Sequence, residues 1–307
     1  MPKVLRIGTR ESQLAVWQAE LVKSQLAQNN IESELIFIKS EGDIDLVTPL
    51  YEIGVQGIFT KTLDAALLSE KIDLAVHSMK DVPVQLAKGI TQAAVLKRAS
   101  YKDILVYKNN TDFLTDPSSF ATIATSSIRR KAQWLHHYPN HKIENLRGNV
   151  NTRLQKVKDN NWHGAIFAAA GVERINVRPE NSMDLNWMLP APAQGAIMIV
   201  CNEDDIATKE ACAALNDEST AICTKIERDF LKTLMGGCST PISALAMIEY
   251  NNIHFRGNIF SLDGKEFIET ASVVELNNAF TLGAEAAKDL FNKGADKITT
   301  AIRNAVV

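Results

Sequence analysis

The stretch LRIGTRESQLAVWQAELVKSQLAQ (5–28), together with ELIFIK (34–39), decides the fold. LRIG (5–8) is a short apolar run of the kind that forms a buried strand. From about Ser12 to Gln28, leucines and a tryptophan recur along one face of a helix. ELIFIK then predicts the next strand. This strand–helix–strand order is typical of α/β folds, whose sheets are built by repeating it.

The same alternation continues outward to about residue 201. It predicts further strands over 73–76, 104–107, 122–125, 143–147, 164–169 and 196–201, and helices over 60–70, 128–137 and 151–159. Such an order implies mostly parallel, doubly wound sheets, in which ligands bind beyond the carboxyl ends of the strands. Residues 40–57, with three glycines and four acids, predict a long functional loop.

The pattern changes near residue 218. A long helix over 218–234 leads to GGCSTP, and three strand-like runs follow before a closing helix over 279–292. The three runs lie at 242–249, 253–260 and 267–275. Consecutive strands with few helices predict a small α+β domain with an antiparallel three-stranded sheet.

The composition is that of an ordinary globular chain. Of 307 residues, 46% are hydrophobic and 22% charged, and the net charge is −3, so nothing global indicates nucleic acid or an acidic membrane surface. The start MPKVLRIGTRES has no apolar signal core, and no apolar run is long enough to span a bilayer. We therefore expect a cytoplasmic protein without membrane contact.

The four cysteines indicate neither disulfides nor a metal site, because they form no CxxC motif and no histidine stands at metal-finger spacing. Cys201, Cys212 and Cys223 lie in predicted strands or helices and are expected to be small buried hydrophobes. Cys238 differs, because it follows two glycines that end a helix and precedes Pro241. A loop thiol near a cleft is a candidate functional group.

Polar side chains collect just after the predicted strands. Because the carboxyl ends of neighbouring strands meet at one edge of a sheet, we expect these groups to line one cleft. They are Arg10, Ser12, His77, Ser78, Lys80, Asp81, Ser126, Ser127, Arg129, Arg130, Arg147, Asn149 and Arg153.

The sign of the charge is informative between residues 121 and 158, where eight Lys or Arg stand against one acid, Glu144. A solvated basic face is the commoner meaning of such a run. Ser126 and Ser127 can cap the following helix, however, and a capped helix start attracts anions. Arginine also suits bidentate binding of carboxylate or phosphate. A groove for nucleic acid would need exposed aromatic residues, but the aromatic residues of this stretch stand at the spacing of a helix core. A small polyanion is therefore the favoured ligand.

Local motifs leave the chemistry open. Neither a phosphate loop, a dinucleotide fingerprint nor a GxSxG nucleophile motif occurs. His77 could act as a base or could be a structural hydrogen-bonding residue. Asp81 could stabilise positive charge that forms during a reaction, or could simply pair with Lys80 or an arginine.

Eight segments in order resemble one family of enzymes. They are LRIGTRESQLAVWQA (5–19), VQGIFTK (55–61), DLAVHSMKDVP (73–83), ATSSIRRKAQ (124–133), LRGNVNTRL (146–154), AAAGVERI (168–175), PAPAQGAI (190–197) and GGCSTPI (236–242). Together they extend over nearly the whole chain, which resembles hydroxymethylbilane synthase, also called porphobilinogen deaminase.

The resemblance implies an enzyme that joins four porphobilinogen units head to tail into a linear tetrapyrrole and releases ammonia at each step. It implies a dipyrromethane cofactor held by a thioether to Cys238, and Asp81 as the catalytic carboxylate at the pyrrole nitrogens. Because every pyrrole ring carries an acetate and a propionate, the local arginine excess suits the growing chain. The residues implied to bind cofactor or substrate are Arg10, Ser12, Gln18, Phe59, Lys80, Ser127, Arg129, Arg130, Arg147, Arg153, Arg174 and Gln194.

The resemblance also implies three domains and a monomer. Two lobes resemble those of periplasmic binding proteins and span 1–99 with 196–216, and 100–195. The third domain, 217–307, carries the cofactor. The strand over 196–201 would then rejoin the first lobe. No metal, nucleic acid or membrane is implied, and porphobilinogen is the expected partner.

Three departures from the family pattern lie near implied substrate contacts. Glu52 and Gln56 stand where many relatives carry lysines, ATSS replaces GTSS, and PAPAQGA replaces PAVGQGA. None of them changes Asp81 or Cys238. Two other classes stay open on these residues: a bilobal anion-binding protein without chemistry, and a nucleic-acid binder that uses 121–158.

Overall fold

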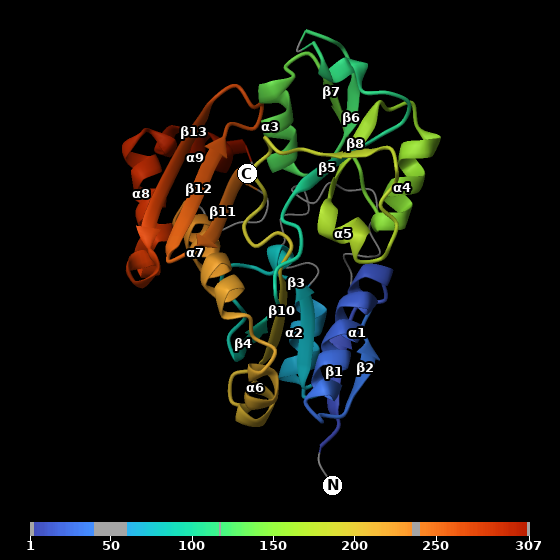
Figure 1. Ribbon diagram of the computed structural model, residues 1–307, viewed down its shortest axis with the longest axis vertical. Coiled ribbons are helices and arrows are strands. Elements are labelled where there is room, and N and C mark those ends of the chain that lie inside the picture. Colours follow the sequence, from blue (N-terminus) through green and yellow to red (C-terminus); the bar gives the residue numbers. More distant parts are fainter. Residues whose placement is uncertain (1–2, 40–59, 117, 235–239, 306–307) are drawn as a thin grey trace.

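The computed structural model describes residues 3–39, 60–116, 118–234 and 240–305. It contains two mixed five-stranded sheets with helices and a separate three-stranded antiparallel sheet (Figure 1). The expected fold class, two α/β lobes followed by an α+β unit, is therefore confirmed. The loop expected over 40–57 lies outside the described residues, as do Phe59 and Cys238.

The first sheet has the order β2-β1-β3-β10-β4 and forms the lower lobe in Figure 1. The elements of this lobe are β1 (Leu5–Thr9), α1 (Gln13–Gln28), β2 (Ser33–Phe37), α2 (Lys61–Leu68), β3 (Leu74–Ser78), β4 (Ile90–Val95), β10 (Ile197–Asn202) and α6 (Ile206–Ala213). Leu74 and Val76 of β3 enter one core with α1, whereas Ala75 enters a second core with α2. Because both faces are covered, the first three residues of the strand, Leu74, Ala75 and Val76, are all apolar.

The second sheet has the order β7-β6-β8-β5-β9 and forms the upper lobe. The elements of this lobe are β5 (Asp103–Tyr107), β6 (Thr122–Ala124), α3 (Ile128–His137), β7 (Lys142–Glu144), α4 (Val150–Asp159), β8 (Gly164–Ala168), α5 (Ala169–Glu173) and β9 (Ser182–Asp184). Here Trp134 of α3 is fully buried against the sheet.

The expectation of mostly parallel sheets is confirmed, because four of the five strands in each lobe run the same way, but one strand of each sheet is reversed. In the first lobe β1 is parallel to β2 and β3, but β10 is antiparallel to β3 and β4. In the second lobe β6 is parallel to β7 and β8, but β5 is antiparallel to β8 and β9. The strands that run against their neighbours, β10 and β5, are each the first strand after the chain crosses from the other lobe. They are therefore not placed by a strand–helix–strand crossover, which keeps strands parallel.

In the third unit, three helices pack against the sheet β11-β12-β13, and the last of them is at the end of the described chain. Its elements are α7 (Glu218–Leu234), β11 (Ile242–Glu249), β12 (Asn252–Phe260), β13 (Phe267–Glu275), α8 (Leu282–Asn292) and α9 (Ala295–Ala305). Phe230 of α7 meets Phe255 of β12 edge to face, with ring centroids 5.2 Å apart. The helix expected from residue 279 begins at Leu282, because a 3-10 helix (Leu276–Thr281) precedes it. The elements β4, β9, α5 and α9 were not predicted from the sequence, and α6 was expected only as a helical pattern around Cys212.

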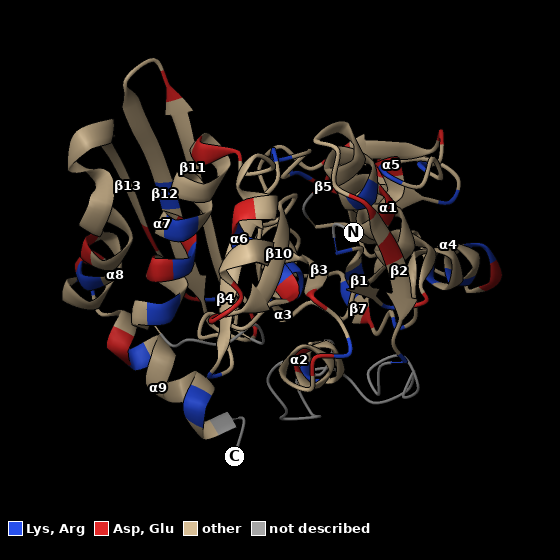
Figure 2. Cartoon of the chain, turned by 90° about the horizontal axis from the view of Figure 1, so that it is seen from below, with Lys and Arg blue, Asp and Glu red and all other residues tan. Residues whose placement is uncertain are grey.

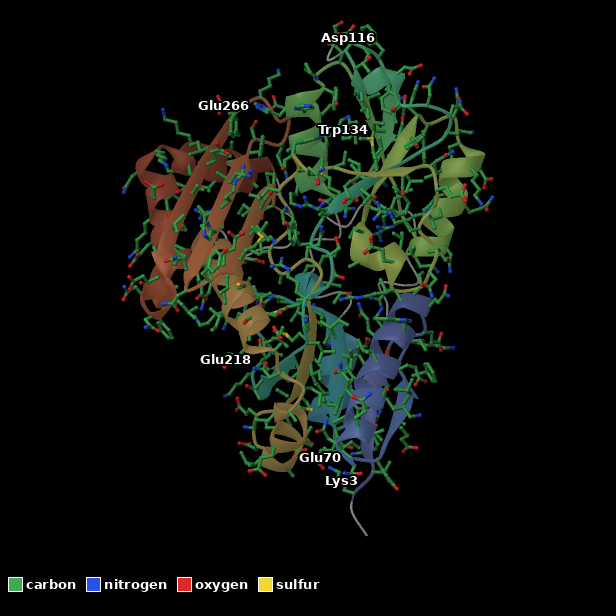
Figure 3. The ribbon with its side chains drawn as sticks, viewed as in Figure 1. Lys3, Glu70, Asp116, Trp134, Glu218 and Glu266 are labelled. Carbon is green, nitrogen blue, oxygen red and sulfur yellow. The ribbon has the colours of Figure 1, made fainter. Side chains whose placement is uncertain are left out.

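Two crossing segments join the lobes, residues 96–102 and residues 185–196. They pair with each other, because the Ala99 amide donates to the carbonyl of Gly195 at 3.1 Å. Lys3 and Glu70 lie at the far end of the first lobe and Asp116 at the far end of the second, away from this crossing (Figure 3). The domain boundaries expected from the sequence stay predictions. No helix within the described ranges is both long and apolar enough to cross a membrane.

The turn between β12 and β13 docks onto α3, and Gly264 makes this contact possible. Gly264 has φ +76°, and a Cβ there would lie 2.3 Å from the carbonyl oxygen of Ala132 in α3. Gly294 also has positive φ, +98°, but a Cβ there would meet no atom within 4 Å.

We expect Gly264→Ala to lower the apparent midpoint of thermal unfolding more than Gly294→Ala does. Both variants carry the same kind of backbone strain, but only Gly264→Ala forces packed backbone apart, which costs about 1–3 kcal/mol. Equal shifts of the two midpoints in a thermal melt would show that the turn does not press on α3.

Candidate active site

The turn after β3 carries Lys80 and Asp81. A 3-10 helix (Met79–Asp81) follows the buried strand, and the amide of Val82 donates to the carbonyl of Met79 at 3.1 Å. Asp81 is exposed, whereas Lys80 is half-buried. The Lys80 Nζ donates to Oε1 of Gln194 at 3.4 Å, which links this turn to the second crossing segment.

The second lobe brings the start of α3 to the same place. The expected helix cap is confirmed for Ser127, whose Oγ accepts from the Arg130 amide at 3.4 Å. Ser126 does not cap the helix. Its Oγ donates to the carbonyl of Leu146 at 2.7 Å and accepts from the amide of the same residue at 2.9 Å. Through these two hydrogen bonds Ser126 links the start of α3 to the residue that precedes Arg147.

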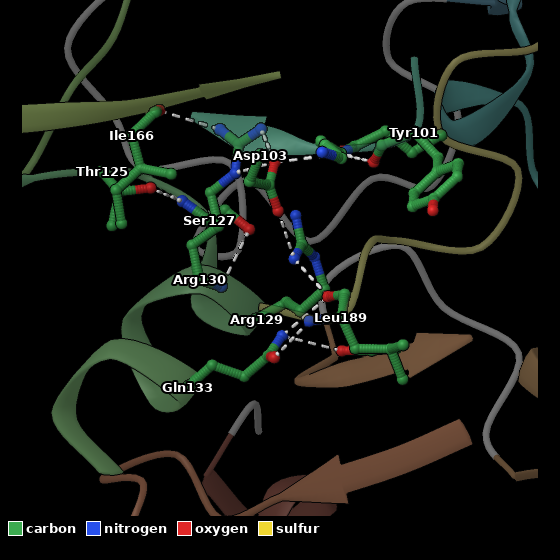
Figure 4. Close-up of polar contacts among 12 residues, drawn as sticks. Tyr101, Asp103, Thr125, Ser127, Arg129, Arg130, Gln133, Ile166 and Leu189 are labelled. Carbon is green, nitrogen blue, oxygen red and sulfur yellow. Dashed lines mark hydrogen bonds and ion pairs between the residues drawn. The ribbon is translucent and has the colours of Figure 1, made fainter. Parts of the chain in front are cut away.

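Arg129 and Arg130 share one buried carboxylate, that of Asp103 at the start of β5 (Figure 4). Nη1 of Arg129 lies 2.7 Å from Oδ2 of Asp103. Nε and Nη2 of Arg130 donate to Oδ1 at 3.0 and 2.7 Å, and Nε2 of Gln194 donates to the same oxygen at 2.9 Å. All four side chains are buried. The two arginines expected to bind a ligand are therefore already held by an acid from another strand.

The turn after β3 and the start of α3 meet at what we call the junction, together with Asp103 and Gln194. The charged groups at this junction shift one another's pKa values. Burial alone would raise the pKa of Asp103, but the charges of Arg129 and Arg130 outweigh it and hold that pKa well below its usual range. Asp103 is therefore ionised at neutral pH. Burial, followed by the positive charge of Arg130, lowers the pKa of the Lys80 ammonium to about 8. Lys80 is therefore mostly charged at neutral pH and loses its proton under mildly alkaline conditions.

Arg147 and Arg153 approach from the start of α4. Asn149 caps this helix, so that Arg153 stands one turn inside it. Burial and then the charge of Arg130 lower the pKa of Arg153 to about 10, Arg147 adds to this effect, and the carboxylate of Asp81 opposes it. Arg153 therefore lies within electrostatic reach of Asp81, although the two residues belong to different lobes.

A small recess of about 50 Å³ opens where the three units meet. It is lined by Lys80, Ser127, Arg129, Ala191, Pro192, Leu231, Thr240 and Ile242. Leu231 and Thr240 stand in the sequence on either side of Cys238, which is itself outside the described residues. The recess is thus lined by cations from both lobes and by residues that precede and follow Cys238 in the sequence.

Two expected ligand-binding residues of α1 make contacts within the first lobe. Ser12 caps α1, because its Oγ accepts from the amide of Ala15 at 3.4 Å. Gln18 is buried, and its Nε2 donates to Oγ of Ser78 at 2.8 Å. The contact of Gln18 lies at the end of β3, and direct ligand contact by Ser12 or Gln18 stays a prediction.

Arg174 and Arg10 also have neighbours within the chain. Nη2 of Arg174 donates to the carbonyl of Gly195 at 2.7 Å, and its guanidinium lies 5.7 Å from the ring centroid of Trp17. Burial and then the nearby charge of Arg10 lower the pKa of His77 to about 4, so that this imidazole is neutral at pH 7. Ligand binding by either arginine stays a prediction, and both alternatives for His77 stay open.

The sequence analysis missed the acids that organise this junction. Asp103 precedes the apolar run ILVY, so a charge beside a buried strand was the available signal. Glu227 of α7 is fully buried and lies 2.6 Å from Nη1 of Arg98. Oε2 of the same carboxylate accepts from the amide of Ala193 at 2.6 Å. Glu227 therefore binds the third unit to both crossing segments.

Three cysteines behave as the sequence analysis expected. Cys201, Cys212 and Cys223 are free and buried. Burial raises the pKa of these thiols to about 11, 12 and 11, respectively, so they are protonated and unreactive at neutral pH. Within the described part of the chain, no group of three or more His, Cys, Asp or Glu side chains could hold a metal ion.

Comparison with known proteins places the chain in one family. Residues 5–210 match the family model described as porphobilinogen deaminase, dipyromethane cofactor binding domain, and residues 221–292 match the porphobilinogen deaminase C-terminal domain. The chain is 39% identical to porphobilinogen deaminase of Chlorobium phaeobacteroides, over 99% of each chain. It is 40% identical to that of a Nitratiruptor species, over 96% of this chain and 95% of the relative.

Among solved structures, the chain is similar to the probable amino-acid ABC transporter extracellular-binding protein ytmK from Bacillus subtilis. The TM-score is 0.43 at 13% identity, and the match covers 70% of this chain and 91% of that one. The family assignment rests on the sequence matches, which extend through both lobes and the third unit. The chain belongs to the porphobilinogen deaminase family.

Proposed function

We propose that this member of the porphobilinogen deaminase family joins four porphobilinogen units head to tail into hydroxymethylbilane, on a dipyrromethane tethered through Cys238. We further propose that it acts in the cytoplasm as a monomer. The observation that carries the proposal is the charge at the junction of the three units. Five cations meet there with two carboxylates: Lys80, Arg129, Arg130, Arg147 and Arg153 with Asp81 and Asp103. A substrate with two carboxylates on each ring suits this positive excess.

The described residues also suit a carboxylate-bearing dipyrromethane. Nε of Arg129 and Nε of Arg153 are buried and have no hydrogen-bond partner among the described residues. Buried donors are normally satisfied, so open donors such as that of Arg129, which lines the recess, are typical of a site that a ligand completes. Arg129, Arg153 and Ser127 would hold carboxylates there. When bound, dipyrromethane supplies the pyrrole end to which the first substrate unit is joined.

Asp81 is the group proposed to act on the reacting atoms. When ammonia leaves porphobilinogen, the carbon–nitrogen bond breaks and positive charge spreads onto the pyrrole nitrogen. The pyrrole that attacks also gains positive charge until it loses a proton. An exposed carboxylate within reach of both nitrogens stabilises these cations in the transition state. The cations around Asp81 would bind the carboxylates of the rings and so present the nitrogens to it.

The tether is tested by the intact mass of the protein, purified from a host that makes porphobilinogen. We expect the wild-type protein to be heavier than its sequence by a two-ring pyrrole adduct, and Cys238→Ala to lack the adduct and to form no product. Cys223→Ala is the matched control, because it removes a buried thiol from the same unit and should keep the adduct. An unmodified, folded wild-type protein, or an adduct that persists in Cys238→Ala, would overturn the proposal.

A further inference from the structure

Helix α7 reaches the turn that carries Asp81 through one side chain, Arg228. Its Nη1 donates to the carbonyls of Val82 at 2.9 Å and Met79 at 3.4 Å, and its Nη2 donates to the carbonyl of Pro83 at 2.6 Å. The guanidinium is half-buried between α7 and the turn. Three carbonyls of one five-residue turn are thus held by a single planar cation, which fixes their relative orientation.

The hydrogen bonds from Arg228 matter because the turn has few hydrogen bonds within itself. The 3-10 helix (Met79–Asp81) is a single turn, and short 3-10 segments have weaker hydrogen-bond geometry than α-helices. Its closing bond runs from the amide of Val82 to the carbonyl of Met79. Arg228 donates to the same Met79 carbonyl and to the carbonyl of Val82, so it holds the residues on both sides of Asp81.

The part of α7 that carries Arg228 is itself held firmly by other segments. The preceding residue, Glu227, is fully buried and binds three separate segments. Its carboxylate accepts from Arg98, from the amide of Ala193 at 2.6 Å and from the amide of Ala246 at 2.8 Å. Acidic and basic residues follow one another along α7 (Figure 2), and the consecutive pair Glu227 and Arg228 contacts the crossing segments and the turn with Asp81. Arg228 therefore ties the position of the turn to α7, the helix that precedes Cys238 in the sequence.

We propose that Arg228 is a positioning residue for Asp81, which holds the turn 79–83 at a fixed distance from the unit that carries Cys238. The inference rests on the proposed role of Asp81 and extends it. Arg228 does not touch the reacting atoms. It keeps the carboxylate aligned with the pyrrole nitrogens, so its loss affects the chemical step more than the binding of substrate.

The test compares Arg228→Met, Arg228→Lys and the control Lys225→Met, each as the full-length, cofactor-loaded protein. Lys225 lies on the same helix but is exposed and pairs with Asp229 on the surface. For Arg228→Met we expect kcat to fall by about 10–100-fold with KM changed much less, because misplacement of a reacting group by about 1 Å can cost that much. Arg228→Lys should recover part of kcat, since its ammonium can reach one or two carbonyls. Lys225→Met should match the wild type.

A second measurement reports on the turn without using activity. Hydrogen exchange, followed by mass spectrometry, should be faster in the peptide that contains Val82 in Arg228→Met, and unchanged in peptides of β11 and β12. A wild-type kcat in Arg228→Met, or faster exchange throughout the third unit, would overturn the positioning role. Failure of the proposed function would look different, because the wild-type protein itself would then lack the adduct or form no product.

Discussion

Replacing Asp81 with alanine is expected to lower the rate of product formation by on the order of 10³-fold, the loss typical of removing one strong electrostatic group from a transition state. Asp81 faces positive charge on two pyrrole nitrogens in each cycle of condensation. Neither Lys80 nor Arg153, whose pKa values the charge of Asp81 raises, can replace a carboxylate, because both are cations. The defect should therefore appear in kcat.

The fold and the cofactor should survive this substitution. Asp81 is exposed, so its removal should change the free energy of unfolding by about 0.5 kcal/mol or less. The intact mass should still include the two-ring adduct. Asp81→Asn keeps the shape but removes the charge, so it should be nearly as inactive as Asp81→Ala.

The control is Asp204→Ala, which removes an exposed acid from a turn after β10, away from the junction. It should form product at the wild-type rate. The measurement is the initial rate of hydroxymethylbilane formation by variants shown by mass to be fully loaded. Near-normal product formation by Asp81→Ala would remove Asp81 from the mechanism.

Replacing Asp103 with alanine should have the largest effect on stability. It would leave Arg129 and Arg130 buried beside each other without their shared counter-charge, and Gln194 would lose an acceptor. Removing one partner of a buried ion pair costs about 3–5 kcal/mol, because the remaining charge stays desolvated. Asp229→Ala breaks the exposed pair with Lys225 instead and should cost about 0.3–0.5 kcal/mol.

The pH dependence of this stability difference follows from the pKa of Asp103. The arginines hold that pKa well below its usual range in the folded protein, whereas in the unfolded chain it is about 3.9. The stabilisation is therefore fully present above about pH 5 and is lost as the pH falls through the folded-state pKa. Urea unfolding at pH 7 and pH 5 should give the same difference between wild type and Asp103→Ala. A difference that shrinks between these two pH values would show that Asp103 is not held ionised by the arginines.

The local elements of the fold could be predicted well from the sequence. The helix expected over 128–137 is α3 and the helix expected over 218–234 is α7, with the same ends in both cases. Helical periodicity and caps such as Ser127 depend on residues a few positions apart, so the sequence contains all the information needed. By contrast, β4 and β9 were missed, because β9 has only three residues and ITQAAV in β4 has no clear alternation of apolar and polar residues.

The candidate site was predicted as a set of residue types but not as a network. A count of charges between residues 121 and 158 found a basic excess, yet the acid that pairs with Arg129 and Arg130 is Asp103, outside that window. The contact of Arg228 with the Asp81 turn joins residues about 145 positions apart. Such contacts leave no periodic signal, since each partner alone is an ordinary charged residue.

By itself, then, the sequence determined the order of most strands and helices, the capping of α3, the inert character of three cysteines and the family to which the chain belongs. These properties depend on local spacing or on motifs preserved residue by residue. Only the tertiary structure decided the reversed direction of β5 and β10, the sharing of Asp103 by two arginines and the hold of α7 on the turn with Asp81. The physical reason is that strand pairing and buried ion pairs are set by which segments meet in space after the chain has crossed twice between its lobes.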